Sequence, residues 1–246
     1  MPKFFIKSSQ IENDKITIIG EDVNHIANVL RKQIEDELNI CNIDTSDNFL
    51  CQIKKIEKEK IECKIIKTTA SKTETNTYIT VFQGLPKAEK MEFIIQKCTE
   101  IGVKEFVPVQ MERCIVKFDS KTANKKIERW EKIAETAAKQ SGRDIIPKVE
   151  NVLNFQNLLN LIKKYDIVLL AYENEHRNTL KNVLKKLKKA ENLKVGIIIG
   201  PEGGITDAEV KSLEQNGAKT ITLGNRILRT ETAGIVTSSI IIYELE

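Results

Sequence analysis

The sequence has no long apolar run. Nothing in its 246 residues approaches the roughly 18–20 consecutive apolar residues of a membrane-spanning helix, so no membrane span is predicted. Residues 1–10 contain only a short apolar patch, which is too short for a signal peptide. We therefore expect a cytoplasmic protein. The net charge of +4 permits an anionic partner but does not require one.

Patterns of metal ligands are also missing. The five cysteines form no Cys-x-x-Cys pair, and the chain has only two histidines. Zinc sites are typically built from closely spaced cysteines and histidines, so no metal site is predicted. We interpret the cysteines as small, buried, reduced thiols. They are Cys41, Cys51, Cys63, Cys98 and Cys114.

The character of the chain changes near residue 70. Residues 1–70 contain five short apolar runs and one helical pattern, which predict a small β-rich domain. Residues 68–77 are polar and without periodicity, as is typical of a linker, so a second domain is expected over 74–246. The expected strands of the first domain are 4–6, 16–19, 38–44, 49–56 and 61–66, and its helix is 21–31.

Strands alternate with helices in residues 74–246. This alternation predicts an α/β fold, with a parallel sheet that helices cover on both faces. Thr206 and Glu209 form a capping box for a helix that should end near Gly217. The lysines of 181–194 are expected to be the solvated face of an amphipathic helix. The expected strands are 78–83, 105–109, 166–171, 195–199 and 220–223, and the other helices are 87–101, 122–141, one around 180–187 and one from 231.

An unusual loop, Gly-Pro-Glu-Gly-Gly, follows the apolar strand 195–199. Ligands bind at the carboxyl ends of strands in such sheets, and glycines let a ligand lie against bare backbone. The chain lacks both the Walker pattern and Gly-x-Gly-x-x-Gly, and Glu202 would repel a phosphate. A neutral or cationic ligand fits better. The alternative is a tight turn that needs positive φ at Gly203 or Gly204.

A second unusual loop follows the next strand. Residues 223–233, LGNRILRTETA, combine a glycine turn, two arginines and a helix start, and we expect this strand end to adjoin the first. A third strand end, residues 170–173, should lie in the same row. Several such loops at one edge favour a pocket over accidental turns.

These residues together resemble the SPOUT methyltransferases, specifically the RsmE type. The resemblance rests on GPEGG with Thr206 and Glu209, on RILRTETA, and on blocks around residues 87–103, 129–147 and 25–31. It implies an α/β fold with a C-terminal trefoil knot and a small N-terminal PUA-like β-barrel. It also implies a homodimer that uses S-adenosylmethionine to methylate N3 of a uridine in 16S rRNA of the small ribosomal subunit.

The resemblance also implies which residues hold the cofactor, largely through backbone. The glycines would let a bent cofactor lie on bare backbone, and a nearby acidic group would tolerate its sulfonium cation. The implied contacts are Leu170, Ala171, Tyr172, Gly200, Pro201, Glu202, Gly203, Gly204, Leu223, Gly224, Arg226, Ile227, Leu228, Thr232 and Ala233.

Methylation at uracil N3 needs loss of a proton, and negative charge then spreads onto O2 and O4. A cationic donor near those oxygens would stabilise this charge. Arg229 is the first candidate, with Thr230 as a supporting donor; alternatively, Arg229 only pairs with a glutamate. Glu202 and Glu231 are candidate proton acceptors, although either could serve only to shape the loop.

Basic residues are expected to hold the RNA through its phosphates. For each of them, an ordinary solvated surface charge is the alternative. Two other functions stay open: a SPOUT methyltransferase that acts on another nucleotide, and a non-catalytic ribosome-assembly protein that binds RNA. The candidate RNA contacts are His25, Arg31, Lys32, Lys87, Lys90, Arg113 and Arg143.

Overall fold

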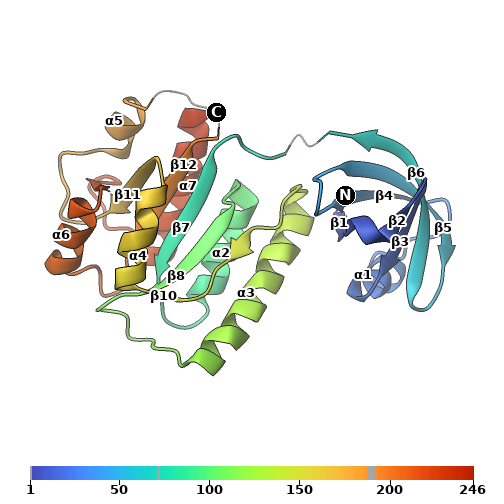
Figure 1. Cartoon of the computed structure of the whole chain (residues 1–246), viewed down its shortest axis with the longest axis horizontal. Coiled ribbons are helices and arrows are strands. Elements are labelled where there is room, and N and C mark those ends of the chain that lie inside the picture. The colour runs from blue at the N-terminus through green and yellow to red at the C-terminus, as the bar shows by residue number, and fades with distance from the viewer. Residues whose placement is uncertain (1, 71–72, 188–191) are drawn as a thin grey trace. The chain divides into compact units, whose positions relative to one another are not determined.

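The chain divides into two compact units, which are described separately here. The computed structural model (Figure 1) describes residues 2–70, 73–187 and 192–246. The first unit consists of Met1–Glu74 together with Ala138–Ile146, and the second of Thr75–Ala137 with Pro147–Glu246. The domain boundary expected after residue 70 adjoins residues 71–72, which lie outside the described residues. That boundary stays a prediction, and no sequence pattern indicated that 138–146 would group with the first unit.

The first unit is a curled six-stranded mixed sheet, a half-barrel where a small barrel was expected. Its strand order is β1-β4-β5-β6-β3-β2; β1 and β4 are parallel and the other pairs antiparallel. Alternate residues of β5 are buried, so one face of the sheet forms the core. The strands are β1 (Lys3–Ile6), β2 (Ile11–Glu12), β3 (Lys15–Ile19), β4 (Glu37–Asn42), β5 (Asn48–Ile56) and β6 (Lys60–Thr69).

The expected helix 21–31 is only partly α-helical. One α-turn, α1 (Glu21–Asn24), passes into a π-helix, η2 (His25–Val29), in which the Leu30 N–H donates to the His25 carbonyl at 2.8 Å. Arg31 then takes a left-handed conformation, with φ of +52°. The apolar spacing indicated a helix but could not reveal the wider turn, because both helix types bury nearly the same residues. A 3₁₀ turn, η1 (Ser8–Gln10), precedes β2.

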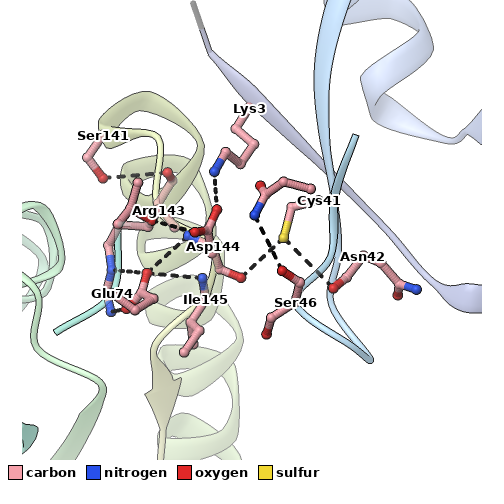
Figure 2. A network of polar contacts seen from close by, with 12 residues as sticks. Lys3, Cys41, Asn42, Ser46, Glu74, Ser141, Arg143, Asp144 and Ile145 are labelled. Atoms are coloured by element: carbon pink, nitrogen blue, oxygen red, sulfur yellow. Dashed lines mark hydrogen bonds and ion pairs between the residues drawn. The ribbon is translucent and has the colours of Figure 1, made fainter. Parts of the chain in front are cut away.

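A buried polar network joins the segment 138–146 to the rest of the first unit (Figure 2). The Glu74 carboxylate accepts from Arg143 through Nε at 3.2 Å and Nη2 at 2.6 Å, and also from the backbone N–H of Asp144 and Ile145. Lys3 pairs with the Asp144 carboxylate, and the Cys41 thiol donates to the Asp144 carbonyl. Buried charges are tolerated only when paired in this way.

The second unit contains the expected parallel sheet, with strand order β10-β8-β7-β12-β11-β13 and β9 paired with β8. Figure 1 shows α4 on one face and α7 on the other, where α7 contacts α2, β7 and β12. The strands are β7 (Tyr78–Gly84), β8 (Glu105–Gln110), β9 (Lys148–Val149), β10 (Leu153–Asn154), β11 (Ile167–Ala171), β12 (Lys194–Ile199) and β13 (Ala218–Ile221). The helices are α2 (Lys90–Ile101), α3 (Ser120–Ser141), α4 (Phe155–Leu161), η3 (Ile162–Lys164), α5 (Leu180–Leu184), α6 (Asp207–Gln215) and α7 (Thr230–Leu245).

Most expected elements of the second unit are present, and the differences are local. The capping box at Thr206 and Glu209 is confirmed, and Gly217 follows α6 with φ of +96°. Helix α2 begins at Lys90 rather than 87, because Ala88 has a left-handed φ of +55°. The sequence analysis missed the short β9, β10 and α4. The lysine-rich run 181–194 includes residues 188–191, which lie outside the described residues; before them α5 covers only Leu180–Leu184.

All five cysteines are free and buried, as expected. Burial raises the pKa of Cys41 to about 11 and the pKa of Cys51 and Cys63 to about 12, so these thiols stay protonated. Among the helices within residues 2–70, 73–187 and 192–246, none combines the length and apolar character needed to cross a bilayer.

The Glu74–Arg143 pair is expected to be a large contributor to the stability of the first unit. Glu74→Ala would remove the carboxylate that accepts from the buried Arg143 guanidinium and from two backbone N–H groups, so we expect the free energy of unfolding to fall by about 3–5 kcal/mol. Glu57→Ala, which breaks exposed pairs with Lys55 and Lys60, should cost under about 1 kcal/mol. Urea denaturation followed by circular dichroism measures both; equal losses would contradict the assignment.

Candidate functional site

Three neighbouring strands of the second unit end side by side and carry the unusual loops. Residues 200–204 follow β12, residues 172–173 follow β11, and residues 222–229 follow β13. The row was expected, but one detail is corrected: β12 and β13 are not adjacent, because β11 lies between them. The loop after β11 is therefore the centre of the site rather than its margin.

Two cavities open along this row. One, of about 430 Å³, lies between the glycine loop and the start of α7; the other, of about 480 Å³, lies between the loops after β11 and β13. They share Ala171, Glu173, Ile227, Leu228 and Ala233 as lining residues, so they are two parts of one cleft. Volumes in this range suit a small-molecule ligand.

Most of the expected cofactor contacts line this cleft. Three of the residues predicted for the site line neither cavity: Leu170, which is buried inside β11, Thr232 and Glu231. The first cavity is lined by Ala171, Gly200, Pro201, Glu202, Gly203, Gly204, Ile227, Leu228 and Ala233, together with Arg229 and Thr230. The second is lined by Ala171, Tyr172, Leu223, Gly224, Arg226, Ile227, Leu228 and Ala233.

The glycine loop is both a tight turn and a cavity wall. The Gly204 N–H donates to the Pro201 carbonyl at 2.9 Å, and Gly204 has φ of +71°, so the turn itself requires glycine here. Arg113 Nη1 donates to the Gly203 carbonyl at 3.1 Å from outside the cavity. The alternative of a tight turn and the prediction of a pocket therefore describe the same loop.

Glu202, the only charged residue of this loop, is held by the start of α2. Its carboxylate accepts from Lys90 Nζ at 2.9 Å and from the Lys87 N–H at 3.1 and 3.3 Å. Burial alone would raise the pKa of Glu202, but these donors outweigh it and lower the pKa below its ordinary value. Glu202 is thus an ionised, fully engaged carboxylate, which fits a structural role better than proton transfer.

Glu231 has weaker contacts than Glu202. It stands in the first turn of α7, where the helix dipole favours a negative charge. Its Oε2 atom lies 3.5 Å from Lys90 Nζ, and its side chain is 16% exposed. Lys90 therefore sits between two carboxylates, and the hydrogen bond that it donates to Glu202 raises the pKa of its ammonium.

The two residues expected to stabilise the uracil oxygens differ in their surroundings. Arg229 is exposed and lines the first cavity; in the described part of the chain no hydrogen bond or ion pair engages its side chain. The alternative in which it pairs with Glu202 or Glu231 is not seen, because Lys90 takes both partners. Thr230 is 7% exposed and its hydroxyl donates to the Gly200 carbonyl at 2.6 Å, so its hydrogen atom is already engaged; a role as donor to the substrate stays a prediction.

The candidate RNA contacts also divide by environment. Arg143 is 3% exposed and bound to Glu74, an environment that disfavours a contact with a phosphate, and the RNA contact predicted for it stays untested. Lys90 belongs to the cavity wall rather than to an open basic surface. His25, Arg31 and Lys32 in the first unit stay predictions, as do Lys87 and Arg113 in the second. His25 packs edge-on against Phe4, with 5.8 Å between the ring centroids.

Sequence reasoning missed two groups at the site. Gln83, near the end of β7, donates to the Thr230 hydroxyl. Its position in a buried strand did not mark it as a site residue, although a glutamine is unusual in such an apolar run. Glu173 lines both cavities and approaches Gly204 so closely that a Cβ there would lie 2.8 Å from its Oε1 atom. Among the described residues, no cluster of His, Cys, Asp and Glu could hold a metal ion.

Known families and structures match the whole chain. Residues 73–242 match the family described as RNA methyltransferase domain, and residues 18–66 match the RNA methyltransferase PUA domain. The chain is 40% identical to Ribosomal RNA small subunit methyltransferase E of Bacillus subtilis, over 100% of this chain and 98% of that protein.

Two solved structures are similar over almost their whole length. One is Ribosomal RNA small subunit methyltransferase E from Neisseria gonorrhoeae bound to S-adenosyl methionine (TM-score 0.86, 28% identity, 98% of this chain and 96% of that one). The other is a putative methyltransferase from Legionella pneumophila in complex with the same cofactor (TM-score 0.85, 27% identity, 97% and 96%). The resemblance inferred from the glycine loop and the RILRTETA segment is confirmed: the chain belongs to the ribosomal RNA small subunit methyltransferase E family.

Proposed function

We propose that this protein transfers a methyl group from S-adenosylmethionine to N3 of a uridine in 16S rRNA of the small ribosomal subunit. Family membership supports rRNA methylation, and the similar structures named above contain the cofactor. The observation that carries the proposal is the cleft, in which bare backbone and the carboxylates of Glu173 and Glu202 lie beside Arg229, whose side chain has no partner among the described residues. The uridine and its N3 atom come from the motif resemblance.

The cleft fits a cationic, bent cofactor. Ile199, Ile205 and Leu228 line it with apolar surface, and residues 200–204 line it with backbone. The carboxylates of Glu173 and Glu202 line the first cavity, and a negative charge there suits a sulfonium. When bound, S-adenosylmethionine would supply an activated methyl group on this sulfonium.

The residues of this chain would then supply placement, charge and a proton acceptor. Positioning N3 against the methyl carbon supplies much of the rate of a displacement reaction. As N3 forms its bond to that carbon, the bonding electrons of the methyl–sulfur bond pass to sulfur. The N3 proton passes to a base, and Arg229 would stabilise the charge that develops on O2 and O4.

Glu231 is the better candidate for the base. Glu202 already accepts hydrogen bonds from Lys87 and Lys90 and is held ionised by them. Glu231 has one contact with Lys90, at 3.5 Å, and stands two residues after Arg229. A base near the arginine would receive the proton on the side where the charge develops.

The remaining parts of the proposal concern the assembly. The RNA phosphates would be contacted by His25, Arg31, Lys32, Lys87 and Arg113. Such contacts fix the position of the RNA on the protein and do not select its sequence. The proposal also includes a homodimer and a C-terminal trefoil knot, both of which are implied by the resemblance.

Methyl transfer can be tested on small ribosomal subunits that lack the modification. Purified protein and labelled S-adenosylmethionine are added, and the digested nucleosides are identified by mass spectrometry; we expect 3-methyluridine. A different methylated nucleoside would keep the enzyme class and change the target. Bound cofactor with no methylation would instead favour a non-catalytic assembly protein.

Arg229→Ala should lower kcat about a hundredfold to a thousandfold, because it removes charge stabilisation in the transition state. The dissociation constant of S-adenosylmethionine, measured by calorimetry, should change less than about threefold, since the cofactor is held by backbone. Arg177→Ala, at an exposed arginine outside the cleft, is the control and should be unaffected. A large loss of cofactor affinity with unchanged kcat would contradict this role for Arg229.

The two glutamates should respond differently to amidation. Glu231→Gln removes the proposed base and should lower kcat about a hundredfold or more. Glu202→Gln weakens the contact with Lys90, so it should mainly raise the KM for the cofactor, with kcat reduced less than about tenfold. Initial rates at varied cofactor concentration separate the two effects, and the reverse pattern would make Glu202 the base.

Gly84→Ala should weaken cofactor binding although Gly84 lines neither cavity. A Cβ at this position would lie 2.6 Å from Pro201 Cδ and 2.7 Å from its N, so the glycine loop would have to move. We expect a dissociation constant at least about tenfold higher, since such overpacking typically costs 1–3 kcal/mol. Gly234→Ala is the control, because its Cβ would meet nothing closer than 3.9 Å. Equal affinities for both variants would show that the loop does not depend on this contact.

A further inference from the structure

A glutamine is buried where the central strands end. Gln83 lies near the end of β7, in register with Ile199 of β12, and is 0% exposed. Glutamine is mostly found at the surface, and a buried one needs hydrogen bonds. Its amide nitrogen donates to the Thr230 hydroxyl at 2.8 Å and to the Gly84 carbonyl at 2.9 Å. The Gln83 amide nitrogen is thus hydrogen-bonded to segments around the cleft rather than to water.

Thr230 extends this chain of hydrogen bonds to the glycine loop. Its hydroxyl accepts from Gln83 and donates to the Gly200 carbonyl at 2.6 Å. Three segments far apart in sequence are therefore tied together: the end of β7, the first residue of the loop after β12 and the first residue of α7. The Gln83 amide nitrogen also reaches the Gly200 carbonyl directly, at the longer distance of 3.5 Å. We call this group, Gln83, Thr230 and the Gly200 carbonyl, the latch.

The latch fixes two features on which the site depends. The Gly200 carbonyl is held inside the protein, which sets the orientation of the peptide bond that begins the glycine loop. Arg229 immediately precedes Thr230 and is the N-cap of α7, with extended backbone (φ −64°, ψ 153°). Because no described residue pairs with its side chain, the position of Arg229 is set by its backbone and by the anchored Thr230.

We infer that Gln83 and Thr230 are positioning residues, whose latch aligns Arg229 and the glycine loop with each other. The inference rests on the proposed function, and it adds a residue, Gln83, that lines neither cavity. It differs from ordinary core hydrogen bonding in a measurable way. Breaking the latch changes the rate of methyl transfer, whereas breaking an equally buried bond elsewhere in α7 changes stability alone.

Thr230→Val tests the latch, because it removes the hydroxyl while nearly keeping the side-chain shape. We expect kcat/KM on unmodified small subunits to fall about tenfold to a hundredfold, the effect of one unsatisfied buried hydrogen bond. Thr230→Ser restores the hydroxyl and should stay within about threefold of the original protein. The serine variant separates a specific effect of the latch from a general loosening of the fold, because restoring the hydroxyl would reverse only the first.

Thr237→Val is the matched control. Thr237 is also in α7 and is 0% exposed, but its hydroxyl donates to the Ala233 carbonyl of its own helix at 2.7 Å. Its substitution should lower the melting temperature without lowering kcat/KM. Gln83→Met supplies a second route if Thr230→Val does not fold. Combining the two changes should cost no more than the larger single loss, since both break the same chain of bonds.

The outcomes separate the latch from the proposed function. If the original protein neither methylates the subunits nor binds S-adenosylmethionine, the proposed function fails. If it is active and folded Thr230→Val has unchanged kinetics, the latch is overturned. A serine variant as impaired as the valine variant, or a Thr237→Val variant equally slow, would also overturn it.

Discussion

The glycine loop of residues 200–204 has almost no side chains with which to fix its own shape, and the site depends on how its neighbours hold it. Glycine loses more conformational freedom on folding than other residues, so a fixed glycine loop needs external contacts. Here those contacts come from every side: Arg113 binds the Gly203 carbonyl, Lys90 binds Glu202, and Gly84 leaves room for Pro201. Two of these contacts, from Arg113 and at Gly84, come from residues that line neither cavity, so they shape the loop without covering the backbone that faces a ligand.

The two cations at the site, Lys90 and Arg229, differ in their partners. Lys90 is occupied by Glu202 and Glu231, while Arg229 beside it has no described partner for its side chain. One cation therefore stabilises the resting arrangement of the loop, and the other is the one that the proposed function assigns to the substrate. A lysine offers a compact charge, whereas an arginine offers a planar fork of donors. The two residues are therefore not interchangeable in these roles.

The sequence predicted the parts of this protein that local patterns determine. Periodicity located β12 and α6, and Thr206 with Glu209 marked a helix start. It could not predict that β11 separates β12 from β13, because strand order depends on pairing between distant segments. It also could not reveal the partners of Thr230 and Arg143, because each partner lies far away in sequence: the Gly200 carbonyl for Thr230 and Glu74 for Arg143.

The first unit closes with a segment that comes late in the chain. Residues 138–146 provide the guanidinium for Glu74 and the carboxylate for Lys3. During synthesis, the curled sheet is complete once β6 has emerged at Thr69, but its buried polar network has to wait until Ile146 leaves the ribosome. By then all of α3 and two strands of the central sheet have also been made. The amino-terminal unit therefore cannot complete its polar network until the first part of the second unit has been synthesised.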